Sequence, residues 1–250
     1  MAKHITVGVL ALQGGVVEHL NLLRKAAAHI LSSPPPPESK AEDLPEFTFT
    51  EVRTPQQLAQ CDALIIPGGE STTMAIVAQR LGLLEPLREF VKVQHKPVWG
   101  TCAGLVMLAE QVSATKQGGQ ELVGGLDVRV LRNKFGTQLQ SFVAGLELGF
   151  LEKGGEAEPF RAVFIRAPVV EEVNIATQRE EKGNGPVEVL GVYQQGQGKE
   201  GNKDIVAVRQ GNVFGTSFHP ELTDDARIHV WWLRQVVDAV RHGGLVINGA

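Results

Sequence analysis

Short apolar runs alternate with amphipathic stretches along the first half of the chain. Ile5–Leu10 is an apolar, β-branched run that ends at a glutamine and two glycines, and it predicts a buried strand. Val16–Ile30 follows with apolar residues at helical spacing and predicts a helix. The same alternation predicts strands at Phe47–Val52, Ala63–Ile66 and Pro97–Trp99, and helices at Pro55–Gln60, Thr72–Leu81, Pro86–Gln94 and Leu105–Gln111.

The second half of the chain is richer in predicted strands and ends in an amphipathic helix at Asp224–Arg241. Strands that alternate with helices across glycine turns indicate an α/β fold, with a mostly parallel central sheet and helices on both faces. We expect residues 1–250 to form a single domain with inserted loops near 32–46, 179–186 and 194–203. The later strands are predicted at Leu126–Leu131, Ala162–Ile165, Val187–Tyr193, Ile205–Gln210 and Asn212–Ser217.

The composition is that of an ordinary globular protein and argues against several classes of partner. Of 250 residues, 43% are hydrophobic and 21% are charged, and a formal net charge of −4 gives no reason to expect nucleic acid or an anionic membrane. No apolar stretch has the length that a membrane-spanning helix needs. Two cysteines do not make a disulfide framework, so a cytoplasmic location is expected. The seven histidines lack the spacing of metal ligands, and no metal site is expected.

The segment Gly100-Thr101-Cys102-Ala103-Gly104 has the pattern of a nucleophile elbow with cysteine in place of serine. In such a turn the nucleophile projects into a cleft between small neighbours, and the amide N–H of the next residue faces a developing oxyanion. The following helix would place its positive end near the sulfur and lower the pKa of the thiol. The alternative is a cysteine buried in a tight turn, and the motif alone leaves both interpretations open.

A base for the thiol is available in the segment SFHPEL, at residues 217–222. His219 and Glu221 are two positions apart at the end of an apolar strand, and in an extended segment such positions face the same way. Taken alone, a surface histidine and a helix-capping glutamate would be the simpler interpretation. The carboxyl ends of parallel strands meet at one edge of a sheet, so this pair and the elbow are expected together.

The segment PGGEST, at residues 67–72, ends a third strand in two glycines. Here the backbone can approach a ligand closely and donate N–H groups to an oxyanion or a carboxylate. Glu70, Ser71 and Thr72 could equally form only the N-terminal cap of the next helix. Capping and ligand contact are compatible, so both interpretations stay open.

In order and spacing, PGGEST, GTCAGL and FHPEL resemble the class I (triad) glutamine amidotransferases, whose fold is flavodoxin-like. Further stretches narrow the resemblance to the glutaminase subunits of pyridoxal 5′-phosphate synthase, from about residue 5 to about residue 240. These stretches are GVLALQGGVVEHL at 8–20, PGGESTTM at 67–74, EPLREF at 85–90, RNKFG at 132–136, FIRAP at 164–168 and SFHPELTDD at 217–225.

The resemblance implies a Cys102 nucleophile with His219 and Glu221 completing a triad, and an oxyanion bound by Gly69 and Ala103. It also implies L-glutamine as substrate, no cofactor, and a hetero-oligomer with the synthase subunit that receives the ammonia. The turn Gln13-Gly14-Gly15, with Glu18 and His19, is expected near the docking face. The glutamine site would be lined by Gly69, Glu70, Ser71, Arg132, Ile165 and Arg166.

Two departures from the family pattern bear on docking rather than on the triad. Thr137 stands where the family usually has an arginine, and Val143 stands where it usually has a glutamate. Three alternatives remain: a glutaminase for another synthase such as the histidine-pathway cyclase, a cysteine hydrolase of the same elbow type, and a silent regulatory subunit. ALQGG with FIRAP argues against the first, and the glutamine-site arginines argue against the second. The intact triad argues against the third, whereas the departures at Thr137 and Val143 weigh slightly in its favour.

Overall fold

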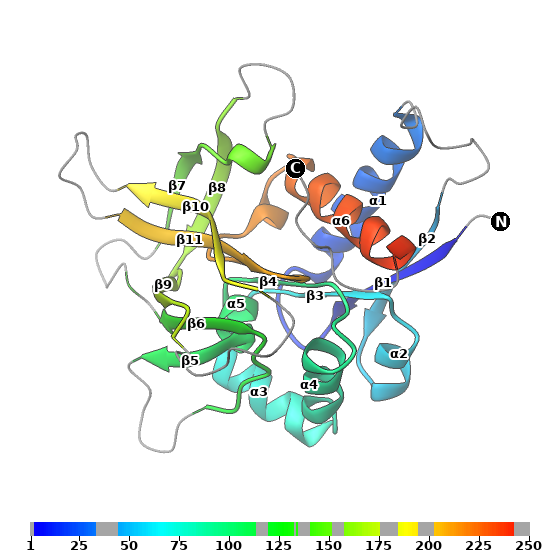
Figure 1. Ribbon diagram of the computed structural model, residues 1–250, viewed down its shortest axis with the longest axis horizontal. Coiled ribbons are helices and arrows are strands. Elements are labelled where there is room, and N and C mark those ends of the chain that lie inside the picture. The colour runs from blue at the N-terminus through cyan, green and yellow to red at the C-terminus, as the bar shows by residue number, and fades with distance from the viewer. Residues whose placement is uncertain are drawn as a thin grey trace.

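The computed structural model describes residues 3–33, 45–113, 120–132, 134, 141–151, 158–175, 185–194 and 203–242. In this part of the chain a ten-stranded sheet runs through the molecule (Figure 1). One half of it is parallel, with neighbouring strands in the order β2 (Glu46–Val52), β1 (His4–Leu10), β3 (Ala63–Ile66), β4 (Val98–Thr101) and β12 (Val213–Thr216).

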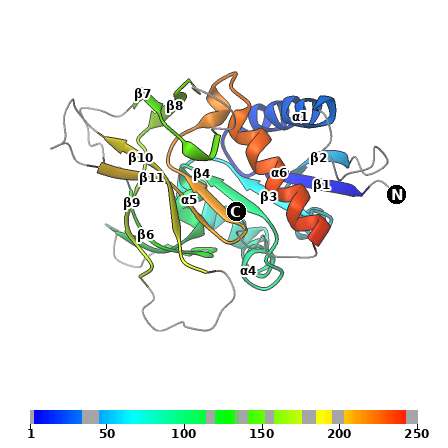
Figure 2. The ribbon, with the colours of Figure 1, turned by 45° about the horizontal axis from the view of Figure 1, so that its top comes forward.

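The other half of the sheet is mainly antiparallel. It continues from β12 through β11 (Lys203–Gln210), β9 (Val169–Val173), β6 (Leu126–Leu131) and β5 (Ala109–Ser113). β5 and β6 are again parallel, and β10 (Glu188–Gln194) pairs with β11. A separate hairpin consists of β7 (Ser141–Leu146) and β8 (Phe160–Ile165). Figure 2 shows these strands gathered at one side of the molecule.

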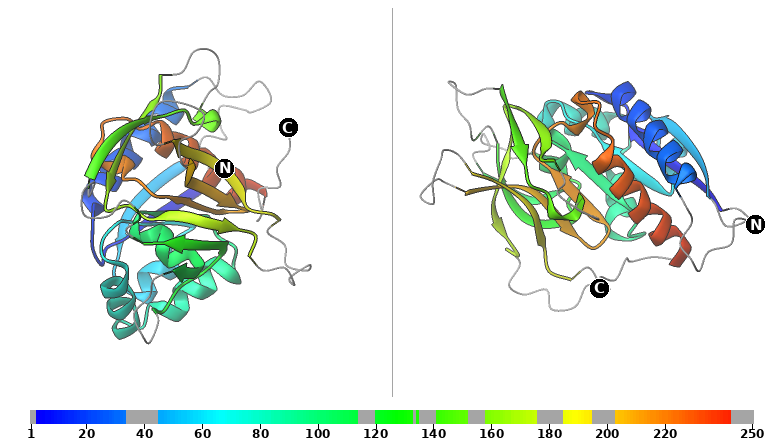
Figure 3. Two further views of the ribbon diagram at one scale, coloured as in Figure 1. Left: turned by 90° about the vertical axis from the view of Figure 1, so that its left-hand side faces the viewer. Right: turned by 90° about the horizontal axis from the view of Figure 1, so that it is seen from above.

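Helices cover both faces of the parallel half. α1 (Val16–Ser32) and α6 (Arg227–His242) lie side by side on one face, as the right-hand view of Figure 3 shows. The opposite face carries α2 (Pro55–Ala59), α3 (Ser71–Arg80), α4 (Leu84–Lys92) and α5 (Ala103–Leu108).

Alternation along the central strands explains this layering. Ile65 in β3 packs in the core on the side of α1 and α6, whereas Leu64 and Ile66 pack in the core on the side of α3, α4 and α5. Successive side chains of a strand point to opposite faces, so a strand covered on both faces reads as an unbroken apolar run. The sequence ALII of β3 is such a run, and all four of its residues are buried.

Three chain segments that carry candidate site residues follow directly after neighbouring strands of the parallel half of the sheet. β3 ends before Pro67-Gly68-Gly69, β4 ends before Cys102, and β12 ends shortly before His219. Because β3, β4 and β12 are adjacent and parallel, these segments meet at one edge of the sheet.

The predicted fold class is confirmed, but some predicted elements are wrong or missing. The helix predicted at Leu105–Gln111 ends at Leu108, and Ala109–Ser113 is instead β5, whose backbone groups pair with β6. β7 and β9 were not predicted from the sequence. The three predicted loops lie mostly outside the described residues.

Candidate active site

Cys102 occupies a sharp turn between β4 and α5. Its backbone has φ 50° and ψ −104°, a conformation that a non-glycine residue adopts at a cost of about 1–3 kcal/mol. The turn is held because the Cys102 N–H donates a 2.8 Å hydrogen bond to the carbonyl oxygen of Thr216 in β12. Its thiol is nearly buried and lies 3.9 Å from the Ile165 carbonyl oxygen. Backbone strain at a pocket residue is typical of a functional position.

The two glycines around Cys102 are required by close packing. A Cβ at Gly104 would lie 2.0 Å from the carbonyl oxygen of Ile66, at the end of β3. A Cβ at Gly100 would lie 2.4 Å from the carbonyl carbon of Gly104. In the elbow, α5 therefore packs directly against β3 and β4, and there is no room for a larger residue at Gly100 or Gly104.

His219 and Glu221 lie together, although not for the reason that the sequence suggested. β12 ends at Thr216, and Pro220–Leu222 form a 3-10 turn (η3) that brings the Glu221 carboxylate back to the imidazole. His219 Nδ1 is 2.8 Å from Glu221 Oε1. The backbone N–H of His219 donates a 2.8 Å hydrogen bond to the carbonyl oxygen of Val163 in β8, and this bond fixes the start of the turn.

The electrostatics favour a charged His219 beside the thiol. Burial opposes protonation of His219, but hydrogen bonding and charge interaction with Cys102 and Glu221 outweigh it and raise the pKa to about 10. Burial likewise opposes ionisation of Glu221, but the hydrogen bond and the charge of His219 hold the pKa of its carboxyl below the usual value. These shifts favour an imidazolium that is bound to an ionised carboxylate and lies beside the Cys102 sulfur.

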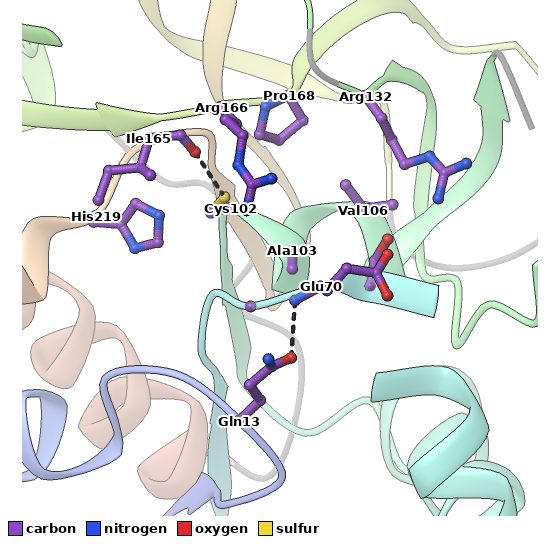
Figure 4. A pocket seen from close by; sticks show the side chains of 12 residues that line it. Gln13, Glu70, Cys102, Ala103, Val106, Arg132, Ile165, Arg166, Pro168 and His219 are labelled. Atoms are coloured by element: carbon purple, nitrogen blue, oxygen red, sulfur yellow. Dashed lines mark hydrogen bonds between the residues drawn. The ribbon is translucent and has the colours of Figure 1, made fainter. Parts of the chain in front are cut away.

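A pocket of about 310 Å³ opens at this edge of the sheet. Cys102 and His219 lie toward one end of it and Arg132 toward the other, with Arg166 between them (Figure 4). The structure brings together nine of the ten predicted site residues as its lining, and Glu221 lies behind His219. The nine are Gly69, Glu70, Ser71, Cys102, Ala103, Arg132, Ile165, Arg166 and His219.

Glu70 both lines the pocket and caps α3. Its carboxylate accepts hydrogen bonds from the backbone N–H groups of Thr72, at 3.1 Å, and Thr73, at 2.7 Å. The two interpretations of PGGEST are therefore compatible, as expected. Burial opposes ionisation of Glu70, but a 2.7 Å hydrogen bond from the Thr73 hydroxyl and these capping bonds lower the pKa of its carboxyl and favour the anion.

The two arginines differ in how they are held. Arg132 Nη1 donates to Thr72 Oγ1 and to Gln120 Oε1, both at 3.1 Å, so its guanidinium is tied to the start of α3. Arg166 is exposed and has φ 44°, and no hydrogen bond or ion pair joins its guanidinium to another described residue. A cationic group without an ion pair can meet a carboxylate of a ligand.

The pocket is also lined by three residues that were not predicted from the sequence, namely Gln13, Val106 and Pro168. Gln13 follows β1, and its Oε1 accepts a 2.9 Å hydrogen bond from the Glu70 N–H, which braces the PGGEST turn (Figure 4). Its place directly after a buried strand, next to two glycines, was the available signal. Pro168 ends the FIRAP stretch, so its proximity to Arg166 was the signal there.

Three positions bear on the expected docking face, and the structure describes two of them. His19 is completely buried, because it lies on the face of α1 that packs inward, so its side chain is not available for docking. Val143 is half exposed on β7 and is available, whereas Thr137 lies outside the described residues.

His19 and a second buried histidine, His229 of α6, make folding sensitive to acid. Burial lowers the pKa of each ring from 6.5 to about 3, in spite of the Glu221 charge beside His19. The unfolded chain binds these protons below pH 6.5 and the folded chain does not, so stability falls as the pH drops from 6.5 toward 3. At pH 5 we expect a loss of about 2 kcal/mol for each histidine.

The measurement is the unfolding free energy from urea denaturation between pH 7 and pH 5. Variant His229→Gln lacks one of the titrating rings and should show a shallower decline than the unmodified chain. Parallel curves for the two proteins would contradict the prediction.

The described residues contain neither a candidate membrane-spanning helix nor a candidate metal site. No helix in the described ranges is long and apolar enough to cross a membrane. In the same ranges, no group of three or more histidine, cysteine or acidic residues is arranged to hold a metal ion.

Comparison with known proteins agrees with the fold. A crystal structure described as a glutamine amidotransferase superposes with a TM-score of 0.65 and 35% identity, over 93% of this chain and 98% of that one. The fold is thus that of the glutamine amidotransferases. The model of the SNO glutamine amidotransferase family matches residues 9–238, and the chain belongs to that family.

Two relatives, one from a plant and one from a yeast, are named as subunits of pyridoxal 5′-phosphate synthase. The probable pyridoxal 5′-phosphate synthase subunit PDX2 of Arabidopsis thaliana is 44% identical, over 92% of this chain and 85% of its own length. The pyridoxal 5′-phosphate synthase subunit SNO1 of Saccharomyces cerevisiae is 41% identical, over 92% of both chains.

Proposed function

We propose that this protein hydrolyses L-glutamine to L-glutamate and ammonia and delivers the ammonia to a synthase subunit that makes pyridoxal 5′-phosphate. Family membership and the names of the relatives support this activity. The observation that carries it is the strained Cys102 in one pocket with His219, whose ring is bound at 2.8 Å by Glu221. This arrangement is suited to attack by a thiolate on an amide.

In the first half of the reaction the Cys102 thiolate attacks the side-chain amide carbon of glutamine. The tetrahedral intermediate collapses as the carbon–nitrogen bond breaks, and the His219 imidazolium gives its proton to the departing ammonia. The product is a γ-glutamyl thioester on Cys102. His219 then takes a proton from water, the hydroxide attacks the thioester, and glutamate leaves as the thiolate is restored. Glu221 keeps the imidazole oriented and stabilises its charge.

The negative charge of the tetrahedral intermediate is bound by the backbone N–H groups of Ala103 and Gly69. Ala103 begins α5, where the first N–H groups of a helix have no partner within it. Gly69 has φ 153°, and a Cβ there would lie 2.7 Å from Gln13 Oε1, so the PGGEST turn is specific to glycine. One such donor is commonly worth about 3–4 kcal/mol, so the position of this turn controls the rate.

The far end of the pocket recognises the amino-acid part of glutamine. Arg132 and Arg166 supply positive charge for the α-carboxylate, and Glu70 supplies an acceptor for the α-ammonium. Ser71 and Ile165 complete the wall of the site. This separation of charges places the amide end of the substrate toward Cys102.

The ammonia passes to the synthase subunit within a hetero-oligomer, and no cofactor takes part in the glutaminase reaction. We place the protein in the cytoplasm, because both cysteines are free and a catalytic thiol needs a reducing compartment.

The test is glutamate release by the purified protein, measured alone and with the candidate synthase subunit, together with labelling by a glutamine analogue whose amide is replaced by an electrophilic diazoketone. We expect faster glutamate release with the synthase present, and label on the peptide that contains Cys102. Excess glutamine should protect that peptide. Label on another residue would contradict the nucleophile, and an inert complex would indicate a regulatory subunit.

A further inference from the structure

The carboxylate of Glu221 has a second oxygen whose surroundings the reaction above does not use. Oε1 accepts from His219, while Oε2 is buried and has no hydrogen bond of normal geometry to any residue that the structure describes. The ring nitrogen His19 Nε2 lies 3.4 Å from Oε2, and both side chains are almost fully buried, with 0% and 1% exposure. A buried carboxylate oxygen without a partner is costly, so this contact sets the orientation of Glu221.

His19 connects three elements around Glu221. Its Nε2 is also 3.4 Å from Thr101 Oγ1, in the residue that precedes Cys102. On its other side, His19 Nδ1 is 3.0 Å from His229 Nε2 of α6. The Trp99 ring packs edge-on against both imidazoles, with centroids 5.7 Å and 4.8 Å away. The pair is thus fixed by packing as well as by hydrogen bonds.

The contacts determine which ring nitrogens carry protons. Both rings are neutral at neutral pH, because burial lowers their pKa values to about 3. A lone pair on His19 Nε2 would face the negative oxygen of Glu221, so Nε2 is the protonated nitrogen and Nδ1 is an acceptor. His229 Nε2–H then donates to His19 Nδ1. His229 Nδ1, which has no hydrogen-bond partner among the described residues, is then unprotonated. It is an acceptor without a donor, and no N–H group is left unsatisfied.

We propose that His19 and His229 form a buried positioning pair, in which His229 Nε2–H orients His19 and His19 Nε2–H fixes the second oxygen of Glu221. The inference rests on the proposed function, since Glu221 matters only if His219 is the catalytic base. Neither histidine touches the substrate. The pair acts through Glu221, by holding the carboxylate in the plane that keeps His219 directed at Cys102.

Removing the His19 donor should lower turnover without changing substrate binding. In His19→Met an apolar side chain replaces the ring, Oε2 loses its donor, and the carboxylate can rotate away from His219. A small misplacement of a catalytic group costs up to about 100-fold in rate. We therefore expect kcat to fall about 10- to 100-fold while KM for glutamine stays within about twofold.

The experiment measures glutaminase kinetics of the complex with the synthase for His19→Met and three further variants. His19→Gln carries an amide donor near the position of Nε2 and should recover most of the loss seen in His19→Met. His29→Met, at an exposed position of the same helix, should behave as the unmodified chain. The double variant His19→Met with His229→Leu should be no slower than His19→Met, because the two rings act in series.

The measurements distinguish failure of the proposed function from failure of the positioning pair alone. An inert unmodified complex would contradict the proposed function, whereas an active complex with unchanged kcat in His19→Met would overturn the positioning pair alone. A rise in KM equal to the loss of kcat/KM would also overturn it. Nitrogen-15 NMR of the histidine rings tests the pair without any activity. Protonated Nε2 on both rings is expected, and protonated Nδ1 on His19 would refute the arrangement.

Discussion

Cys102→Ala is expected to lower glutamine hydrolysis by about 10⁵-fold or more, because no other group in the pocket can form the thioester. The fold should survive, since the thiol interacts with the Ile165 carbonyl oxygen, at 3.9 Å, and with His219, and alanine fits within its volume. Glutamate release should be measured with the synthase subunit present. Loss of less than tenfold would show that Cys102 is not the nucleophile.

Cys61 provides the matched control for this experiment. It is the other free cysteine, it is fully buried, and its sulfur lies 3.3 Å from the Gln57 carbonyl oxygen. Burial raises the pKa of its thiol to about 11, so it stays protonated and unreactive. Cys61→Ala should therefore cost some stability and leave kcat near that of the unmodified chain.

Gly104→Ala is expected to destabilise the protein by about 3 kcal/mol or more. The new Cβ would lie 2.0 Å from the Ile66 carbonyl oxygen, and that atom belongs to backbone at the end of β3 and cannot move aside cheaply. Because α5 and β3 carry both sides of the proposed oxyanion site, any relaxation would also displace Ala103 from Gly69. The measurement is the free energy of unfolding by urea.

Gly149→Ala is the control that isolates the overlap from the change of residue. A Cβ at Gly149 meets no atom within 4 Å, and the residue does not have positive φ. Its stability should stay within about 0.5 kcal/mol of the unmodified chain. Equal stability of the two glycine variants would contradict the close approach of α5 to β3.

The parallel half of the sheet could be predicted because its signals are local. A buried run such as ALII, ended by glycines, is recognisable without knowledge of its neighbours. β5 could not be predicted, since Ala109–Ser113 continues a helix-like pattern and becomes a strand only through pairing with β6. That pairing is a tertiary effect that overrides local propensity.

In the candidate site, too, the residues marked by local motifs could be predicted, and the features that depend on tertiary contacts could not. Cys102, His219 and Glu221 were identified from motifs, but the expected extended geometry between His219 and Glu221 was wrong, because Pro220 starts a 3-10 turn. His19 was expected only close to the docking face. Its role toward Glu221 depends on the packing of α1 against α6, which brings together residues 210 positions apart.

The position of β12 between β4 and β11 has a consequence for biosynthesis of the protein. The ribosome makes the chain from the amino end, so the thiol of Cys102 emerges more than one hundred residues before His219. Until β12 inserts beside β4, the elbow lacks both the Thr216 carbonyl that holds its turn and the imidazole of His219, which is the base of the proposed mechanism. Under that mechanism the nascent chain carries the nucleophile without its base, so it would not hydrolyse glutamine until synthesis is nearly complete.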